Sequence, residues 1–178
     1  MWKILRQIGR AGIATEPAPE SRAGELIEIE RIQRDLLATL GRALAIRHVD
    51  AGSCNGCELE IHALNNVLYD LERFGLRFVA SPRHADVLLV TGPVTKNMRE
   101  ALERTYAATP DPKWVVAVGD CALDGGIFAG SYAVTGGVSQ VIPVDLHIRG
   151  CPPDPTALLK GLLALIEPER AATQQDAR

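Results

Sequence analysis

Two continuous apolar runs constrain the fold of this chain more than any other feature. They are DVLLVTG, residues 86–92, and KWVVAVGD, residues 113–120. Runs without polar alternation are typical of strands that are buried on both faces, as in the centre of a parallel sheet. Between them, TKNMREALERTYAAT (residues 95–109) is predicted to be a helix with Thr95 as its N-cap. A strand, a helix and a second strand in this order predict a parallel β-α-β unit.

The same alternation continues on both sides of this unit. Further strands are predicted at 43–49, 76–80 and 141–148, and further helices at 58–75 and 154–166. The glycine-rich stretch 122–140 is expected to be irregular. Repeated alternation of this kind predicts an α/β fold, a three-layer sandwich on a mostly parallel sheet.

Composition divides the chain into three parts. Residues 1–42 are expected to form an N-terminal helical extension, residues 43–168 the α/β domain, and residues 169–178 a polar tail. Within the extension, apolar positions recur at helical spacing over residues 25–40, so one face of this helix needs a partner, either the domain or another subunit. Residues 1–12 interleave apolar and basic side chains, which fits either an amphipathic helix on a partner or membrane surface or a frayed terminus.

Charge and hydropathy exclude several classes of protein. The formal net charge of −3 gives no electrostatic argument for binding nucleic acid. No apolar run approaches the roughly 20 residues of a membrane-spanning helix, and the start of the chain lacks the continuous apolar region of an export signal. We therefore expect a cytoplasmic protein whose thiols stay reduced.

The four cysteines are the candidates for chemistry, and each of them follows a predicted strand. The carboxyl ends of parallel strands meet at the same edge of a sheet, where ligands collect. We therefore expect all four thiols to lie on loops at one edge. The cysteines are Cys54, Cys57, Cys121 and Cys151.

Several interpretations of these thiols are open. Disulfides are disfavoured in a reducing compartment. A structural zinc ion accepts four thiolates but usually takes them from two short Cys pairs, whereas here one C-x2-C motif is followed by two distant cysteines. Iron–sulfur clusters tolerate scattered ligands, and Cys151 is followed by Pro152 as in ferredoxin motifs. Cys121 and Cys151 could also be small buried hydrophobic residues. The pattern favours a four-cysteine [4Fe–4S] cluster.

Glycines stand beside the cysteines, at positions 52, 56, 119 and 150. Without a Cβ atom, these residues allow backbone N–H groups to approach sulfur atoms closely. The glycines of 119–137 form neither a G-x-G-x-x-G nor a P-loop pattern, so nucleotide binding is not supported.

Five segments together resemble a known family. They are GSCNGCELEI, DLERFG, SPRHADVLLVTGPVT, PKWVVAVGDCALDGGIF and IPVDLHIRGCPPDP, and they run in the family's order from about residue 47 to residue 166. In these segments the chain is similar to the small subunit shared by [NiFe]-hydrogenases and the B subunit (PSST-type) of NADH–quinone oxidoreductase, respiratory complex I. The resemblance implies a flavodoxin-like domain without flavin and one [4Fe–4S] cluster facing a large catalytic subunit. The implied ligands are Cys54, Cys57, Cys121 and Cys151, and no catalytic residue is implied in this chain.

The first cysteine motif distinguishes the branches of this family. The complex I form carries two adjacent cysteines, whereas CNGCELEI looks most like the membrane-bound, energy-converting hydrogenases, such as the small subunit of formate hydrogenlyase. Small subunits of uptake hydrogenases carry more cysteines for further clusters. With only four cysteines, this chain can bind a single such cluster, so a separate ferredoxin-like iron–sulfur subunit is implied.

The resemblance therefore implies an electron-transfer subunit of an oxidoreductase complex at the cytoplasmic face of the inner membrane. Its expected partners are a ferredoxin-like subunit, a hydrogenase large subunit and the membrane subunits of the complex. One alternative is an N2-type cluster subunit that feeds quinone beside a large subunit of the complex I type. A second alternative, from another class, is a zinc-stabilised interaction module.

A few other side chains carry expectations of their own. Glu60 corresponds to a glutamate of the complex I motif, which suggests proton delivery, whereas Glu58 is explained by the helix dipole alone. Arg73 and Arg83 match family positions near the cluster or the large subunit, or are ordinary structural arginines. Arg149 departs from the family's Tyr-Ile-Pro-Gly-Cys-Pro-Pro and would raise the cluster's potential, point into solvent or contact a partner. Three histidines without metal-ligand spacing are expected to be ordinary: His48, His62 and His84.

Overall fold

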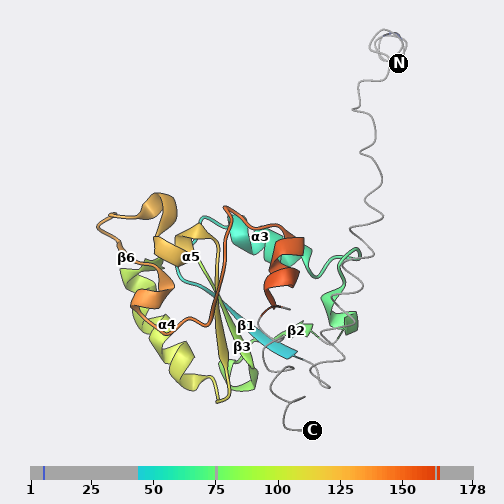
Figure 1. The fold of residues 1–178 in the computed structure, drawn as a ribbon, viewed down its shortest axis with the longest axis horizontal. Helices are drawn as coiled ribbons and strands as arrows, with labels where there is room; N and C mark the ends of the chain where they lie inside the picture. Colours follow the sequence, from blue (N-terminus) through green and yellow to red (C-terminus); the bar gives the residue numbers. More distant parts are fainter. Residues whose placement is uncertain (1–5, 7–43, 75, 163, 165–178) are drawn as a thin grey trace.

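The computed structural model describes residues 44–162 except residue 75, together with residues 6 and 164. Within this part, five strands form one parallel sheet in the order β2-β1-β3-β5-β7 (Figure 1). In chain order this is the 2-1-3-4-5 arrangement of flavodoxin-like folds. The predicted α/β class with a mostly parallel sheet is confirmed. The strands are β1 (Leu44–Asp50), β2 (Leu76–Phe78), β3 (Val87–Thr91), β5 (Trp114–Val118) and β7 (Leu146–Ile148).

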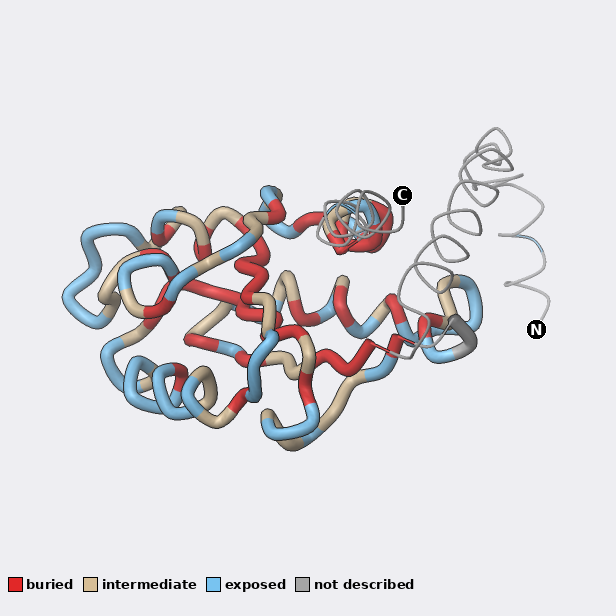
Figure 2. The backbone as a smooth tube through the Cα atoms, turned by 60° about the horizontal axis from the view of Figure 1, so that its bottom comes forward, coloured by how far each residue is buried: buried red, intermediate tan, exposed pale blue. Residues whose placement is uncertain are grey.

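Helices cover both faces of the sheet (Figure 1). On one face lie α3 (Gly56–Ala63) and a helix over residues 155–162, and on the other α4 (Lys96–Ala108) and the short α5 (Asp120–Asp124). The two faces form separate apolar cores. The expected three layers are therefore present, and Figure 2 shows the central strands buried beneath exposed outer segments.

Strand β3 shows why its sequence is apolar throughout. Leu89 packs with Ile61 of α3 and Leu158 in one core, whereas its neighbour Leu88 packs with Leu102 of α4 in the other. Successive side chains of a strand point to opposite faces, so a strand covered on both sides needs apolar residues at every position.

Short elements make up the rest of the described chain. The stretch 122–140, expected to be irregular, in fact contains the end of α5, two 3₁₀ helices and a strand that pairs antiparallel with β4. These elements are β4 (Val94–Thr95), β6 (Val134–Gly136) and the 3₁₀ helices η1 (Leu71–Phe74), η2 (Pro82–His84), η3 (Gly126–Phe128) and η4 (Val138–Gln140).

The helix predicted over 58–75 is much shorter in the structure, because α3 ends at Ala63. The Asn66 side-chain oxygen accepts hydrogen bonds from the backbone N–H groups of Leu68 at 2.8 Å and Tyr69 at 3.0 Å. Such a side-chain turn competes with helical hydrogen bonding. Leu68 is 58% exposed and does not belong to a buried stripe. The predicted strands at 76–80 and 141–148 are likewise shortened, to β2 and β7.

Several expectations fall outside the described residues. The helix predicted at 25–40, most of residues 1–12 and the tail 169–178 lie there, so the limits of the three parts stay predictions. Among the residues that are described, no helix has the length and apolar character needed to cross a membrane.

Candidate metal centre

The loop after β1 carries Cys54 and Cys57, and Asp50 determines its shape. The Oδ1 atom of Asp50 accepts hydrogen bonds from the backbone N–H groups of Gly52 at 2.8 Å and Ser53 at 2.7 Å. This turn leads directly into α3, so Cys57 lies in the first helical turn. Cys54 is exposed and Cys57 is partly buried.

Cys121 and Cys151 lie on two further loops, after β5 and β7, which are joined by hydrogen bonds. The Asp120 N–H donates to the Gly150 carbonyl oxygen at 3.0 Å, and the Gly150 N–H donates to Asp120 Oδ1 at 3.1 Å. Cys121, in α5, is buried, and Cys151 is exposed. The two loops are thereby held in one arrangement relative to each other.

Glycines bring the first loop against the other two. A Cβ atom on Gly119 would lie 2.8 Å from Cys57 Sγ, and one on Gly56 would lie 3.5 Å from Cys54 Sγ and 3.9 Å from Pro152. Gly119 also has φ +87°, a conformation that favours glycine. The loops after β1, β5 and β7 therefore meet at the carboxyl edge of the sheet, as the sequence predicts.

A cavity of about 540 Å³ opens at this edge. Cys121 and Cys151 line it, together with the exposed residue Arg149. A Cβ atom on Gly126, another lining residue, would lie 2.9 Å from Cys121 Sγ. The absence of side-chain atoms at these glycines leaves room around the sulfur atoms.

The thiols influence one another electrostatically. Burial, then the charge of Glu58 and the charges of the other three cysteines, raise the pKa of Cys57 to about 12. Burial also raises the pKa of Cys121, with further contributions from other thiols, while a hydrogen bond from the Ile127 backbone acts in the opposite direction. A bound metal centre would reverse this effect, because cysteines that ligate a metal are deprotonated.

The chemistry of the donor set is compatible with an iron–sulfur cluster, whose iron atoms are held by cysteine thiolates. Among the described residues, no group of three or more His, Cys, Asp or Glu side chains is arranged to hold one metal ion. A [4Fe–4S] cluster spreads four thiolate ligands over four iron atoms, so its ligands stand farther apart than those of one tetrahedral ion. Four thiols on three loops that meet at this edge supply such a donor set.

The other residues singled out in the sequence lie at different places in the fold. Arg149 lines the cavity, as described above. Arg83 is exposed on η2, which leads into the amino end of β3, and it does not line the cavity. Arg73 belongs to η1, ahead of β2. Glu60 is partly buried on α3.

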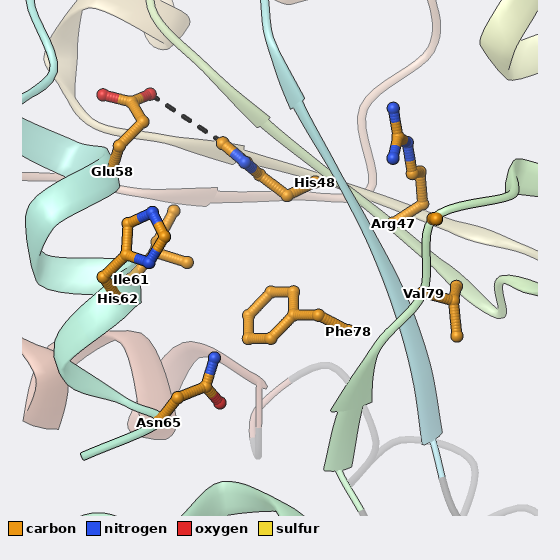
Figure 3. A pocket seen from close by; sticks show the side chains of 9 residues that line it. Arg47, His48, Glu58, Ile61, His62, Asn65, Phe78 and Val79 are labelled. Atoms are coloured by element: carbon orange, nitrogen blue, oxygen red, sulfur yellow. Dashed lines mark ion pairs between the residues drawn. The ribbon is translucent and has the colours of Figure 1, made fainter.

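Sequence reasoning missed the position of Glu58. Glu58 is only 6% exposed, and its Oε1 atom lies 3.8 Å from Nε2 of His48 (Figure 3). The same His48 nitrogen lies 3.0 Å from Oγ1 of Thr91. A helical spacing of three residues puts Glu58 on the same face as the buried Ile61, and this spacing could have indicated its burial.

Comparison with known proteins agrees with this geometry. The family model of the NADH ubiquinone oxidoreductase, 20 Kd subunit, matches residues 54–165, more than half of the chain. The chain belongs to this family. The matched range includes all four cysteines. As a member of this family, the chain is a subunit of an oxidoreductase complex, and the resemblance seen in its sequence is confirmed.

Individual relatives within the family support the same assignment. A probable membrane-bound hydrogenase subunit, mbhJ, of Pyrococcus furiosus is 45% identical over 78% of this chain and 83% of its own length. Formate hydrogenlyase subunit 7 of Escherichia coli is 46% identical over 78% of this chain, which spans 56% of that protein. A chain of the archaeal membrane-bound sulfane sulfur reductase, a respiratory membrane complex, superposes with a TM-score of 0.62 and 35% identity, over 80% of this chain and 75% of that one.

Proposed function

We propose that this chain carries one [4Fe–4S] cluster and relays electrons in a membrane-associated complex of the energy-converting hydrogenase type. In that role it receives electrons from, or delivers them to, a ferredoxin-like subunit on one side and the large catalytic subunit on the other. The names of two relatives, a membrane-bound hydrogenase subunit and a formate hydrogenlyase subunit, support this branch. The proposed ligands are Cys54, Cys57, Cys121 and Cys151.

One observation carries the proposal: three loops far apart in the sequence meet at the carboxyl edge of the sheet, and together they hold every cysteine of the chain. A chain that only needed small buried residues would not place two of its four cysteines at exposed positions. Exposed thiols at an edge where three loops meet are instead suited to ligate a group bound between the loops.

The chain's own residues would bind this group and determine its surroundings. When bound, the cluster supplies a one-electron redox centre. The backbone N–H of Ile127 hydrogen-bonds the sulfur of Cys121 and favours its thiolate form. Arg149 brings a positive charge to the same cavity, which stabilises additional negative charge there.

Two exposed apolar side chains, one close in sequence to Cys57 and one on the cavity wall, support docking of a large subunit. Leu59, two residues after Cys57, is 62% exposed, and Ile127 on the cavity wall is 80% exposed. Apolar side chains grouped around a functional edge indicate an interface. We propose that the large subunit covers this edge and that the complex holds the chain at the cytoplasmic face of the membrane.

A second candidate function is an N2-type cluster subunit that feeds quinone. The family description, a subunit of NADH ubiquinone oxidoreductase, favours it. The partner decides between the two functions. A large subunit with two C-x2-C pairs would provide a nickel site, whereas a large subunit without them would favour the quinone function.

Metal analysis of the complex purified under anaerobic conditions tests the proposal. We expect four iron atoms and four acid-labile sulfides for each copy of this chain, after subtraction of the clusters of other subunits. Co-purification of zinc with no iron or sulfide assignable to this chain would contradict the proposal and would favour the zinc-stabilised interaction module.

A further inference from the structure

The turn that follows α3 presents two adjacent apolar side chains to solvent. Val67 is 100% exposed, and Leu68 is 58% exposed. Leu64 and Leu71, on either side of this turn, are buried in one of the two cores. Single exposed apolar residues are common on protein surfaces, whereas apolar residues exposed side by side indicate a site that another segment covers.

Hydrogen bonds hold this turn in one conformation. The side-chain oxygen of Asn66 accepts a hydrogen bond from the Leu68 N–H at 2.8 Å, and the Asp70 N–H donates to the Asn66 carbonyl oxygen at 2.8 Å. The Leu71 N–H donates to the Leu64 carbonyl oxygen at 3.2 Å, which closes the turn. Because the backbone is already ordered, little conformational entropy is lost when a partner packs against the two apolar side chains.

The turn lies on the side of the domain where the N-terminal extension enters. The helix between two parallel strands runs antiparallel to them, so α3 leads from the cysteine loops toward the amino ends of β1 and β2. In Figure 1, α3 and α5 lie together at one end of the sheet, and β2 lies toward the other. The turn continues into η1, which contacts β2. Leu76, the first residue of β2, pairs with Leu44, the first residue of β1.

This arrangement limits how far the helix predicted over residues 25–40 can lie from the turn. The predicted helix is outside the described residues, but Leu44 is only 1% exposed and is fixed by its pairing with β2. Four residue steps separate residue 40 from Leu44 and span at most about 14 Å. A helix of this length is about 24 Å long. The surface around the amino ends of β1 and β2 is therefore within its reach.

The apolar stripe of residues 25–40 has the chemistry that the turn requires. Its members are Leu26, Ile29, Ile32, Leu36, Leu37 and Leu40. Two exposed side chains offer too little area for a stable interface with a separate chain, which needs roughly 800 Å² from each partner. A segment joined to the domain through residues 41–43 has an effective concentration of about millimolar or higher, so a small contact is enough to hold it. The size of the patch therefore favours a segment of this chain over another subunit.

We propose that residues 25–40 form a helix whose apolar stripe packs over the turn at Val67 and Leu68. At helical spacing, Glu28, Arg31 and Asp35 then fall on the opposite face, where they stay in solvent. The contact leaves the cysteine loops uncovered, so it is compatible with the docking of a large subunit there. The inference does not depend on the bound cluster.

Site-specific photo-crosslinking tests the proposal on the full-length chain, purified with the subunits that accompany it. A benzophenone amino acid in place of Val67 reacts with the segment that covers this position. We expect the product to keep the mass of a single chain and, after proteolysis, to join residue 67 to a peptide from residues 25–40. The same probe in place of Leu59, which is 62% exposed near the cysteines, is the control and should not react with that peptide.

Hydrogen exchange measures the same contact without a bulky probe. In the double variant Val67→Ser, Leu68→Ser, we expect the amide groups of residues 25–40 to exchange at least about tenfold faster than in the wild type, because the helix loses its packing surface. Leu59→Ser is the matched control, since it also replaces an exposed apolar side chain, and it should leave the exchange of residues 25–40 unchanged.

The proposal is wrong if the probe at residue 67 reacts with a second copy of this chain or with another subunit, or yields no product with residues 25–40. It is also wrong if the double variant exchanges as slowly as the wild type, or if Leu59→Ser accelerates exchange equally. None of these results depends on iron content, so the proposed function is tested separately.

Discussion

Gly119 has little freedom to change at the cysteine edge. Its φ of +87° is unfavourable for any side chain, and a Cβ atom would lie 2.8 Å from Cys57 Sγ. Gly130 is a matched comparison, because its φ is +78° but a Cβ atom there would meet nothing within 4 Å. Comparing alanine substitutions at the two positions therefore distinguishes the cost of backbone strain from the cost of a steric clash with the Cys57 sulfur.

We expect Gly119→Ala to lose most of its iron and sulfide, because the added methyl group displaces Cys57. Gly130→Ala should keep a full complement and lose only about 1–2 kcal/mol of stability from the left-handed backbone. Iron and sulfide content and the thermal unfolding midpoint of both variants provide the measurement. Equal iron content in the two proteins would show that Cys57 is not a ligand in the arrangement described here.

The ligand assignment itself is tested at Cys121, the most buried of the four thiols. Replacement by serine keeps the size of the side chain but substitutes a hard oxygen for a soft sulfur ligand. We expect Cys121→Ser to contain an incomplete cluster, to lose the reduced-state EPR signal of the wild type and to abolish activity of the complex. An unchanged signal would show that the four-ligand assignment is wrong.

At the scale of elements, the loop after β1 depends on a single carboxylate. Asp50 ends the strand and accepts hydrogen bonds from two N–H groups of the loop, those of Gly52 and Ser53. Side-chain turns of this kind fix the direction of the chain where a strand gives way to a helix. The position of Cys54 and Cys57 relative to the sheet follows from this turn.

We expect Asp50→Ala to shorten the lifetime of the bound cluster in the presence of an iron chelator, because the loop loses both hydrogen bonds. A net contribution of about 1 kcal/mol for each bond would shift the equilibrium between the ordered and the disordered loop roughly tenfold or more. Asp50→Asn keeps an acceptor oxygen and should lie close to the wild type. The prediction fails if the alanine and asparagine variants release iron at the same rate.

At the scale of the whole molecule, apolar side chains remain uncovered beside the cysteines. Leu59 and Ile127 are 62% and 80% exposed, although the interior of the domain is filled by two apolar cores. Val67 is also fully exposed, but it lies in the turn after α3, farther along the chain from Cys57 than Leu59. The first two residues mark the edge where we propose that the large subunit docks.

We therefore expect the double variant Leu59→Ser, Ile127→Ser to fold normally but to dissociate from the complex more readily. Loss of two interface side chains of this size would weaken binding by at least about tenfold, or about 1.4 kcal/mol. Val67→Ser should have no effect on assembly. Size-exclusion chromatography and pull-down of the large subunit measure the difference. If the wild type and both variants retain the large subunit equally, the large subunit binds another face of this chain.

The sequence by itself determined the class of fold and the edge at which the cysteines gather. Strands β3 and β5 are predictable because burial on both faces leaves no position for a polar residue, and this requirement is local. The cysteines could be assigned to one edge because each follows a strand and parallel strands end on the same side. Only the tertiary structure decided where α3 ends, how the loops after β1, β5 and β7 fit against one another, and that Glu58 faces inward. These features depend on long-range contacts, such as that between Gly119 and Cys57, which no local pattern of residues encodes.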